Sequence, residues 1–77
     1  MKLIIVSPEK TVYEGNATSV VVPGDKGTFE VLDNHAPIIS SLQAGNIVVN
    51  DAGNLMNFDI KSGFIEVAQN TVSICVE

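Results

Sequence analysis

The sequence predicts an all-β domain, built as a sandwich or a barrel, and three observations support this prediction. Short runs of β-branched residues are separated by glycine, proline and asparagine at a spacing typical of these folds. Apolar and polar residues alternate within several runs, as they do in strands that bury one face. No segment joins a capping residue to a 3.6-residue apolar period over three turns, as a stable helix would.

The runs of β-branched residues follow one another along the whole chain. Alternation is clearest where Met56, Phe58 and Ile60 are expected to share one face of a strand. The segment 37–43 is the nearest candidate for a helix, of about one turn. Strands are expected at residues 3–6, 11–13, 18–22, 27–32, 46–49, 55–60, 63–67 and 71–76.

The composition is that of a small globular domain that pairs with another protein. The chain has 77 residues, of which 45% are hydrophobic and only 17% charged. This length allows one domain, and the low charge favours burial of surface against a partner. Small domains often need a disulfide, a metal or a partner for stability. Cys75 is the only cysteine, which excludes an internal disulfide and a cysteine-pair zinc site. A partner protein is therefore the expected source of extra stability.

The charge balance argues against nucleic acid as a partner. The net charge is -5 and arginine is absent, so the chain repels phosphates and has no guanidinium to bind them. No apolar stretch approaches the ~20 residues that span a bilayer, and the first apolar run is too short for a signal peptide. We expect a cytosolic protein with no nucleic acid bound and no direct membrane insertion.

Catalytic chemistry has little support in the residues. His35 is the only histidine, and neither Cys75 nor any serine stands in a nucleophile motif beside it. Asp25, Glu30, Asp33 and His35 are close in sequence, but their spacing fits neither a calcium loop nor a zinc signature. We expect no catalytic residue, no metal and no cofactor, and interpret these acids as a solvated loop.

Lys26 raises one alternative. It lies between two glycines in a Gly-Asp-Lys-Gly turn, and lipoyl and biotinyl carrier domains present such a lysine at a hairpin tip. Carrier domains place the lysine near the middle of two similar halves, whereas Lys26 falls at about one third of this chain, and glycine-flanked Asp-Lys is common turn composition. A carrier domain modified at Lys26 remains the second hypothesis, and a free-standing β-sandwich adaptor the third.

The stretch 20–45 carries most of the information about identity. In physical terms it is a strand, a tight turn, a second strand, a polar loop and a return directed by proline. Gly24 and Gly27 permit positive φ around the turn. Asn34 tolerates the left-handed region, and Pro37 holds the residue before it extended.

This stretch resembles the epsilon subunit of the rotary F-type ATP synthases. The family has valines, a Gly-x-x-Gly turn, a short strand, and then His-Ala-Pro followed by aliphatic residues and Leu-x-x-Gly. The resemblance covers the whole chain in register, although Asn34 replaces the usual glycine. The matching segments here are Val20-Val21-Val22-Pro23-Gly24, Gly27, His35-Ala36-Pro37-Ile38-Ile39 and Leu42-Gln43-Ala44-Gly45, flanked by Val6-Ser7-Pro8-Glu9, Ser62-Gly63-Phe64-Ile65-Glu66-Val67 and Asn70-Thr71-Val72-Ser73-Ile74.

The resemblance implies a fold and a role. The fold would be a flattened β-sandwich of two antiparallel sheets, with roughly 8–10 short strands in a single domain over residues 1–77. The role would be that of a non-catalytic central-stalk subunit of the alpha/beta/gamma/delta/epsilon sector, helping to couple gamma to the c-ring during proton-driven ATP synthesis. The location would be the cytoplasmic face of a bacterial inner membrane, reached through the complex.

The resemblance also implies contact residues. Nothing here matches the C-terminal helical hairpin found in most relatives, so restraint of ATP hydrolysis and nucleotide binding are not carried over. For His35, a hydrogen bond within its own domain is the alternative to a gamma contact. The c-ring contact would comprise Gly24, Asp25, Lys26, Gly27, Thr28, Phe29 and Glu30, and the gamma contact Ser7, His35, Pro37 and Ile38.

Overall fold

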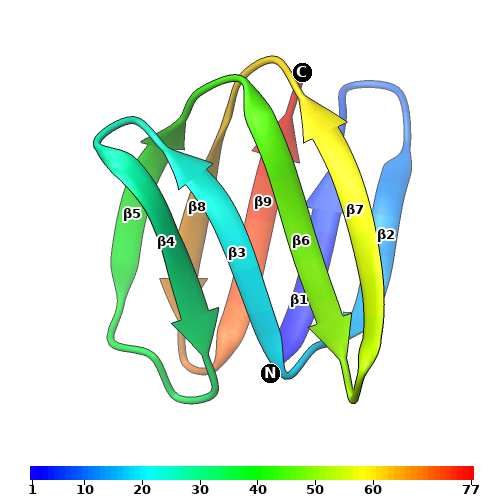
Figure 1. Ribbon diagram of the computed structural model, residues 1–77, viewed down its shortest axis with the longest axis vertical. Helices are drawn as coiled ribbons and strands as arrows, with labels where there is room; N and C mark the ends of the chain where they lie inside the picture. Colours follow the sequence, from blue (N-terminus) through cyan, green and yellow to red (C-terminus); the bar gives the residue numbers. More distant parts are fainter.

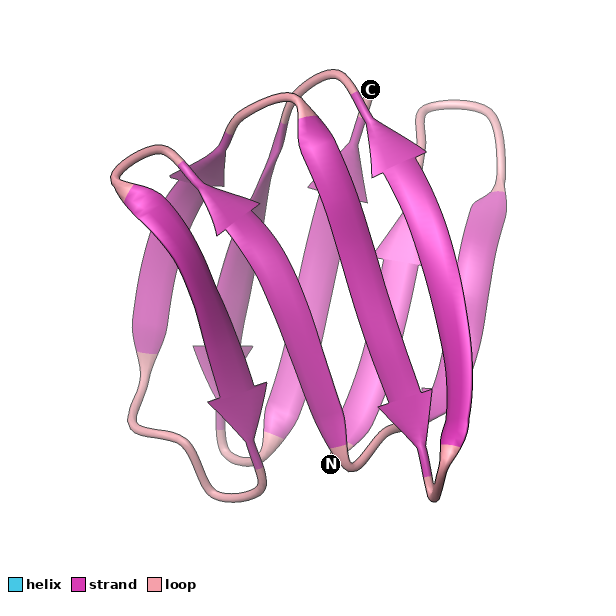
Figure 2. Cartoon of the chain, viewed as in Figure 1, coloured by secondary structure: helices cyan, strands magenta, loops and turns pink.

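The computed structural model describes residues 1–77 and consists of strands and turns without a helix (Figure 2). Nine strands follow one another along the chain. They are β1 (Lys2–Val6), β2 (Thr11–Asn16), β3 (Ser19–Gly24), β4 (Gly27–Leu32), β5 (Ile38–Leu42), β6 (Gly45–Asp51), β7 (Asn54–Ile60), β8 (Gly63–Ala68) and β9 (Thr71–Val76).

The strands form two facing layers (Figure 1). One layer has the order β2-β1-β9-β8-β5 and the other has β4-β3-β6-β7. The layers join where Gly24 of β3 pairs with Leu42 of β5, so they are two halves of one curled sheet. The predicted flattened sandwich is thus confirmed, with one addition. β1 lies parallel to β9, because nearly the whole domain forms the long crossover that a parallel pair needs.

The core between the layers is entirely aliphatic. Alternate residues of each strand point inward, which gives β9 a pattern of one buried residue in two. No polar or charged residue is buried, so the core contains no polar side chain whose desolvation must be offset. The fifteen buried hydrophobic residues of the core are Leu3, Ile5, Ala17, Val20, Val22, Val31, Leu42, Ile47, Val49, Ile60, Ile65, Val67, Val72, Ile74 and Val76.

The expected strands are confirmed, with ends that differ by up to three residues. Met56, Phe58 and Ile60 do share the inner face of β7. The expectation of a helical turn at residues 37–43 was wrong, because Ile38–Leu42 is strand β5 and pairs with β8 along its full length. Pairing with a strand more than twenty residues away, rather than local preference, decides this segment.

Two hairpin turns place residues in the left-handed region. In the β6–β7 turn Ala52 has φ of 52° and Gly53 of 97°, and in the β8–β9 turn Gln69 has 49° and Asn70 has 58°. Positive φ at both central residues is the geometry that matches the twist of paired strands. The predicted left-handed conformation of Asn34 is confirmed by a φ of 61°.

Candidate interaction surfaces

The turn between β3 and β4 (residues 24–27, the β3–β4 turn) projects from one end of the sandwich (Figure 1). Gly27 has the predicted positive φ, at 128°, whereas Gly24 does not. Gly24 is needed for space instead, because a Cβ there would lie 2.8 Å from the carbonyl oxygen of Gly27 and 2.8 Å from a ring carbon of Phe29. The ring therefore packs over the base of the turn.

The base of the β3–β4 turn is tied to β5 and the residue after it. The N–H of Asp25 donates to the carbonyl oxygen of Ser41 at 3.1 Å, and the N–H of Gln43 donates to that of Pro23 at 2.9 Å. The side chain of Gln43 also donates to the carbonyl oxygen of Gly24 at 3.2 Å. The tip is free by contrast, since Asp25 and Lys26 are exposed and take no part in the single ion pair of the chain.

An open cleft of about 580 Å³, the turn cleft, lies between the β3–β4 turn and β5. Its walls are residues 24–29 on one side and residues 38–41 on the other. The structure thus brings together all the residues predicted for the c-ring contact except Glu30, together with Ile38 from the predicted gamma contact. Ile38 packs partly against the core, whereas its neighbour Ile39 points outward and is 72% exposed.

The loop between β4 and β5 (residues 33–37, the β4–β5 loop) carries His35 and Pro37 at the opposite end of β4 from the turn (Figure 1). The N–H of His35 donates to the carbonyl oxygen of Leu32 at 3.2 Å. Its ring Nδ1 lies 2.7 Å from the carbonyl oxygen of Ala36, a contact that Nδ1 satisfies by donating. Both bonds are local, so they shape the loop without tying His35 to the rest of the domain.

Ser7 organises a turn at the other end of the molecule from His35. Its hydroxyl oxygen accepts the N–H groups of Glu9 and Lys10, at 3.4 and 3.3 Å. The β1–β2 turn that contains Ser7 and the β4–β5 loop lie at opposite ends of the sandwich (Figure 1). The four residues predicted to contact gamma therefore do not form one compact patch.

A second cleft of about 470 Å³, the apolar cleft, surrounds Ser7. It includes Phe64, which is 48% exposed, and the exposed Cys75. Register places Ser41, Phe64, Cys75 and Val6 in a row across the outer face of the β5-β8-β9-β1 layer. Sequence reasoning did not single out this row, although large apolar residues at outward positions of alternating strands could have indicated it.

The outer face of the other layer has the opposite character. Along β6 and β7 it presents Asn46, Asn50, Asn57 and Asp59, and Asn46 donates to the carboxylate of Asp59 at 2.6 Å across the strands. The apolar residues that face outward on these two strands are Leu55, which is 65% exposed, and the half-buried Val48. The outer face of β6 and β7 is thus largely polar, while the outer face of the opposite layer carries the row that contains Phe64.

The acidic residues that lie near His35 in the sequence are not gathered into one site by the fold. Asp25 lies in the β3–β4 turn while Asp33 and His35 lie at the far end of β4, and no group of three His, Cys, Asp or Glu side chains is placed to hold a metal ion. The chain also has no helix of the length and hydropathy needed to cross a membrane. The surfaces described above are suited to contact with other proteins.

A model of the ATP synthase delta/epsilon chain β-sandwich domain matches residues 1–77. The chain belongs to this family. The ATP synthase epsilon chain of Leptospira borgpetersenii is 42% identical over 77 residues, and that of Caulobacter vibrioides is 37% identical over 73 residues. The delta/epsilon-family chain described here covers 61% of the length of the first relative and 85% of the second.

Solved structures share the fold of this delta/epsilon-family domain. A chain in the central stalk/c-ring structure of the Tetrahymena thermophila mitochondrial ATP synthase superposes with a TM-score of 0.84 at 13% identity, covering 97% of this chain and 61% of that one. A chain in the OSCP/F1/c-ring structure of the Euglena gracilis mitochondrial ATP synthase gives 0.90 at 19% identity, covering 96% and 48%. The family assignment leaves the carrier-domain alternative at Lys26 without an observation in its favour.

Proposed function

We propose that the chain is a non-catalytic rotor subunit of an F-type ATP synthase, which helps to couple the gamma subunit to the c-ring during proton-driven ATP synthesis. The observation that carries the proposal is the family match over the whole of residues 1–77. Relatives named ATP synthase epsilon chain, and structural neighbours from a central stalk and c-ring, support it. The complex would hold the chain at the cytoplasmic face of a bacterial inner membrane.

The position of β4 supports a coupling role. This strand pairs with β3 along its full length, from Ser19 and Leu32 to Gly24 and Gly27. The β3–β4 turn stands at one of its ends and the β4–β5 loop at the other (Figure 1). Six residues of strand extend over about 20 Å, so a stiff hairpin separates the two surfaces. Force applied at one surface would reach the other through hydrogen-bonded backbone.

The end of the sandwich with the β3–β4 turn is the proposed c-ring contact. The side chains of Asp25 and Lys26 are exposed there and take no part in the ion pair of the chain, so they are free to meet polar loops. Three of the four lysines, Lys10, Lys26 and Lys61, lie in turns at this end (Figure 1). Glu9, Asp25 and Glu77 are exposed at the same end, so it offers charges of both signs to polar loops of the ring.

The proposed gamma contact takes the outer face of the β5-β8-β9-β1 layer. Ser7 lies in the apolar cleft with Phe64, and the β4–β5 loop with His35 leads into β5 at the lower edge of the same layer. Exposed apolar side chains rimmed by polar groups are typical of protein contacts. A contact along this outer face would include both Ser7 and His35, although they stand at opposite ends of the layer.

Co-purification tests the function. A tagged copy of the chain, expressed in its native cell, should recover gamma, the catalytic subunits and the c-ring from solubilised membranes. An Asn57→Ala variant, changed on the polar outer face, should recover the same set. Recovery of the chain without gamma would contradict the proposal. The intact mass of the same material should show no lipoyl-sized or biotinyl-sized addition on Lys26.

A further inference from the structure

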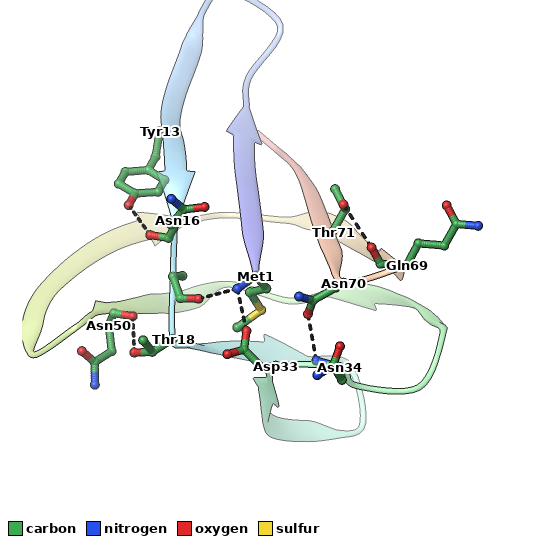
Figure 3. A network of polar contacts seen from close by, with 11 residues as sticks. Met1, Tyr13, Asn16, Thr18, Asp33, Asn34, Asn50, Gln69, Asn70 and Thr71 are labelled. Carbon is green, nitrogen blue, oxygen red and sulfur yellow. Dashed lines mark hydrogen bonds and ion pairs between the residues drawn. The ribbon is translucent and has the colours of Figure 1, made fainter.

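Asn70 links two turns that are 36 residues apart in the sequence (Figure 3). Its side-chain oxygen accepts the backbone N–H of Asn34 in the β4–β5 loop at 2.8 Å. Its own carbonyl oxygen accepts the N–H of Lys2, which begins β1, at 3.1 Å. One residue of the β8–β9 turn therefore contacts both the first strand and the loop that carries His35.

The conformation of Asn70 explains why asparagine suits this position. Its φ of 58° lies in the left-handed region, which asparagine adopts more readily than most residues. Glycine would accept the same backbone but has no side-chain acceptor. The neighbouring Gln69 has a similar φ of 49°, and the only side-chain hydrogen bond at it is local, from the Thr71 hydroxyl to its carbonyl oxygen. The two turn residues thus share a backbone conformation and differ in their contacts.

The β4–β5 loop has few other ties to the domain. The bonds of His35 are local, to Leu32 and Ala36. The remaining long-range tie joins Asp33 to the amine of Met1 at 2.5 Å (Figure 3). Both long-range ties are therefore made by the two residues immediately before His35, where they fix the direction in which the loop leaves β4.

From this geometry we propose that Asn70 is a positioning residue for the gamma contact. By accepting the N–H of Asn34, it holds the β4–β5 loop in the arrangement that presents His35 and Pro37 to the partner. The proposal rests on the function proposed above. Asn70 itself need not touch gamma, because its effect passes through the backbone of Asn34.

Three variants of the full chain test this role. Asn70→Gly keeps the left-handed backbone and removes the acceptor, Asn70→Asp keeps an acceptor, and Gln69→Gly is the matched control in the same turn. Two quantities are measured: hydrogen exchange of the Asn34 amide by NMR, and affinity for the purified gamma subunit. A typical neutral hydrogen bond corresponds to a factor of about 2 to 10 in an equilibrium constant.

Asn70→Gly should therefore speed exchange at Asn34 and weaken gamma binding by about 2-fold to 10-fold. Asn70→Asp should keep the exchange rate and the gamma affinity near their wild-type values, and Gln69→Gly should alter neither. Unchanged exchange in Asn70→Gly would show that the hydrogen bond from Asn34 to Asn70 does not hold the loop. Faster exchange with unchanged affinity would show that this hydrogen bond has no role in gamma binding, while the proposed function stands. If the wild-type chain fails to bind gamma, the proposed function falls and the positioning role falls with it.

Discussion

The rings of Tyr13 and Phe58 contact each other with centroids 6.0 Å apart and planes inclined by 58°. Tyr13 belongs to β2 and Phe58 to β7, which stand at the two ends of the curled sheet's strand order and are not paired with each other. Both rings point inward and pack on the aliphatic core. The pair therefore covers the side of the sandwich on which the curled sheet stays open (Figure 1).

A double-mutant cycle should measure this closure. Tyr13→Leu and Phe58→Leu each preserve apolar bulk but remove the tilted ring contact. We expect the two changes to be non-additive, with a coupling of about 0.5–1.5 kcal/mol in the free energy of unfolding. Urea denaturation of the wild type, both single variants and the double variant gives the value. Additive effects would mean that the rings cover the opening independently of each other.

Much of the fold could be predicted because a strand that buries one face alternates apolar and polar residues in its own sequence. Met56, Phe58 and Ile60 alternate with polar residues, and most of the turns contain a glycine or asparagine that accepts positive φ. Ala52 and Gln69 also adopt positive φ, which their residue types do not predict. Strand β5 lacks this alternation. Ile38 and Ile39 stand side by side and two serines follow, so the alternation is broken and only pairing with β8 makes the segment a strand.

The interaction surfaces could be predicted from the sequence only where their residues are close together along the chain. The β3–β4 turn contains most of its contact residues within one short segment, and the turn cleft does bring them together. Ser7 and Phe64 share a cleft although they are 57 positions apart in the sequence. The bond between Asn34 and Asn70 is of the same kind. Such contacts depend on which strands pair, and periodicity within a strand carries no information about that.

Gly24→Ala should destabilise the domain. The added Cβ would lie 2.8 Å from the backbone oxygen of Gly27, which cannot move without opening the turn. Overpacking of this kind costs about 1–3 kcal/mol. Asp25→Ala is the matched control in the same turn, because the exposed carboxylate can be removed while its N–H keeps the bond to Ser41. Thermal unfolding should therefore separate the two variants; equal midpoints would show that the turn adapts freely.

Thr28→Cys should cross-link to subunit c in the intact complex. Thr28 is exposed and lines the turn cleft. The substitution is made with Cys75→Ser so that only one thiol is present. Asn57→Cys in the same background is the control, since Asn57 is exposed on β7, at the opposite edge of the β4-β3-β6-β7 layer from Thr28. The proposed ring contact is wrong if Thr28→Cys gives no product with subunit c, or gives no more than Asn57→Cys.

His35→Ala should weaken gamma binding without unfolding the free domain. The hydrogen bonds of His35 are confined to the loop, with the ring bonded only to the carbonyl of the next residue. Removing a ring with such local contacts should change the free energy of unfolding by less than about 1 kcal/mol. Urea denaturation and affinity for gamma are measured on the same preparation. Substantial destabilisation would instead assign His35 a role within its own domain.

Ile39 and Ile65 separate contact from stability within one layer. Ile39 of β5 is 72% exposed in the turn cleft, whereas Ile65 of β8 is fully buried. Ile39→Ala should leave the free energy of unfolding within about 0.5 kcal/mol of wild type, and Ile65→Val should lower it by about 0.5–1.5 kcal/mol. Assembly should show the reverse order, because only Ile39 presents apolar surface that a partner can bury. Recovery of rotor subunits with each tagged variant measures assembly, and normal recovery with Ile39→Ala would remove the turn cleft from the proposed interface.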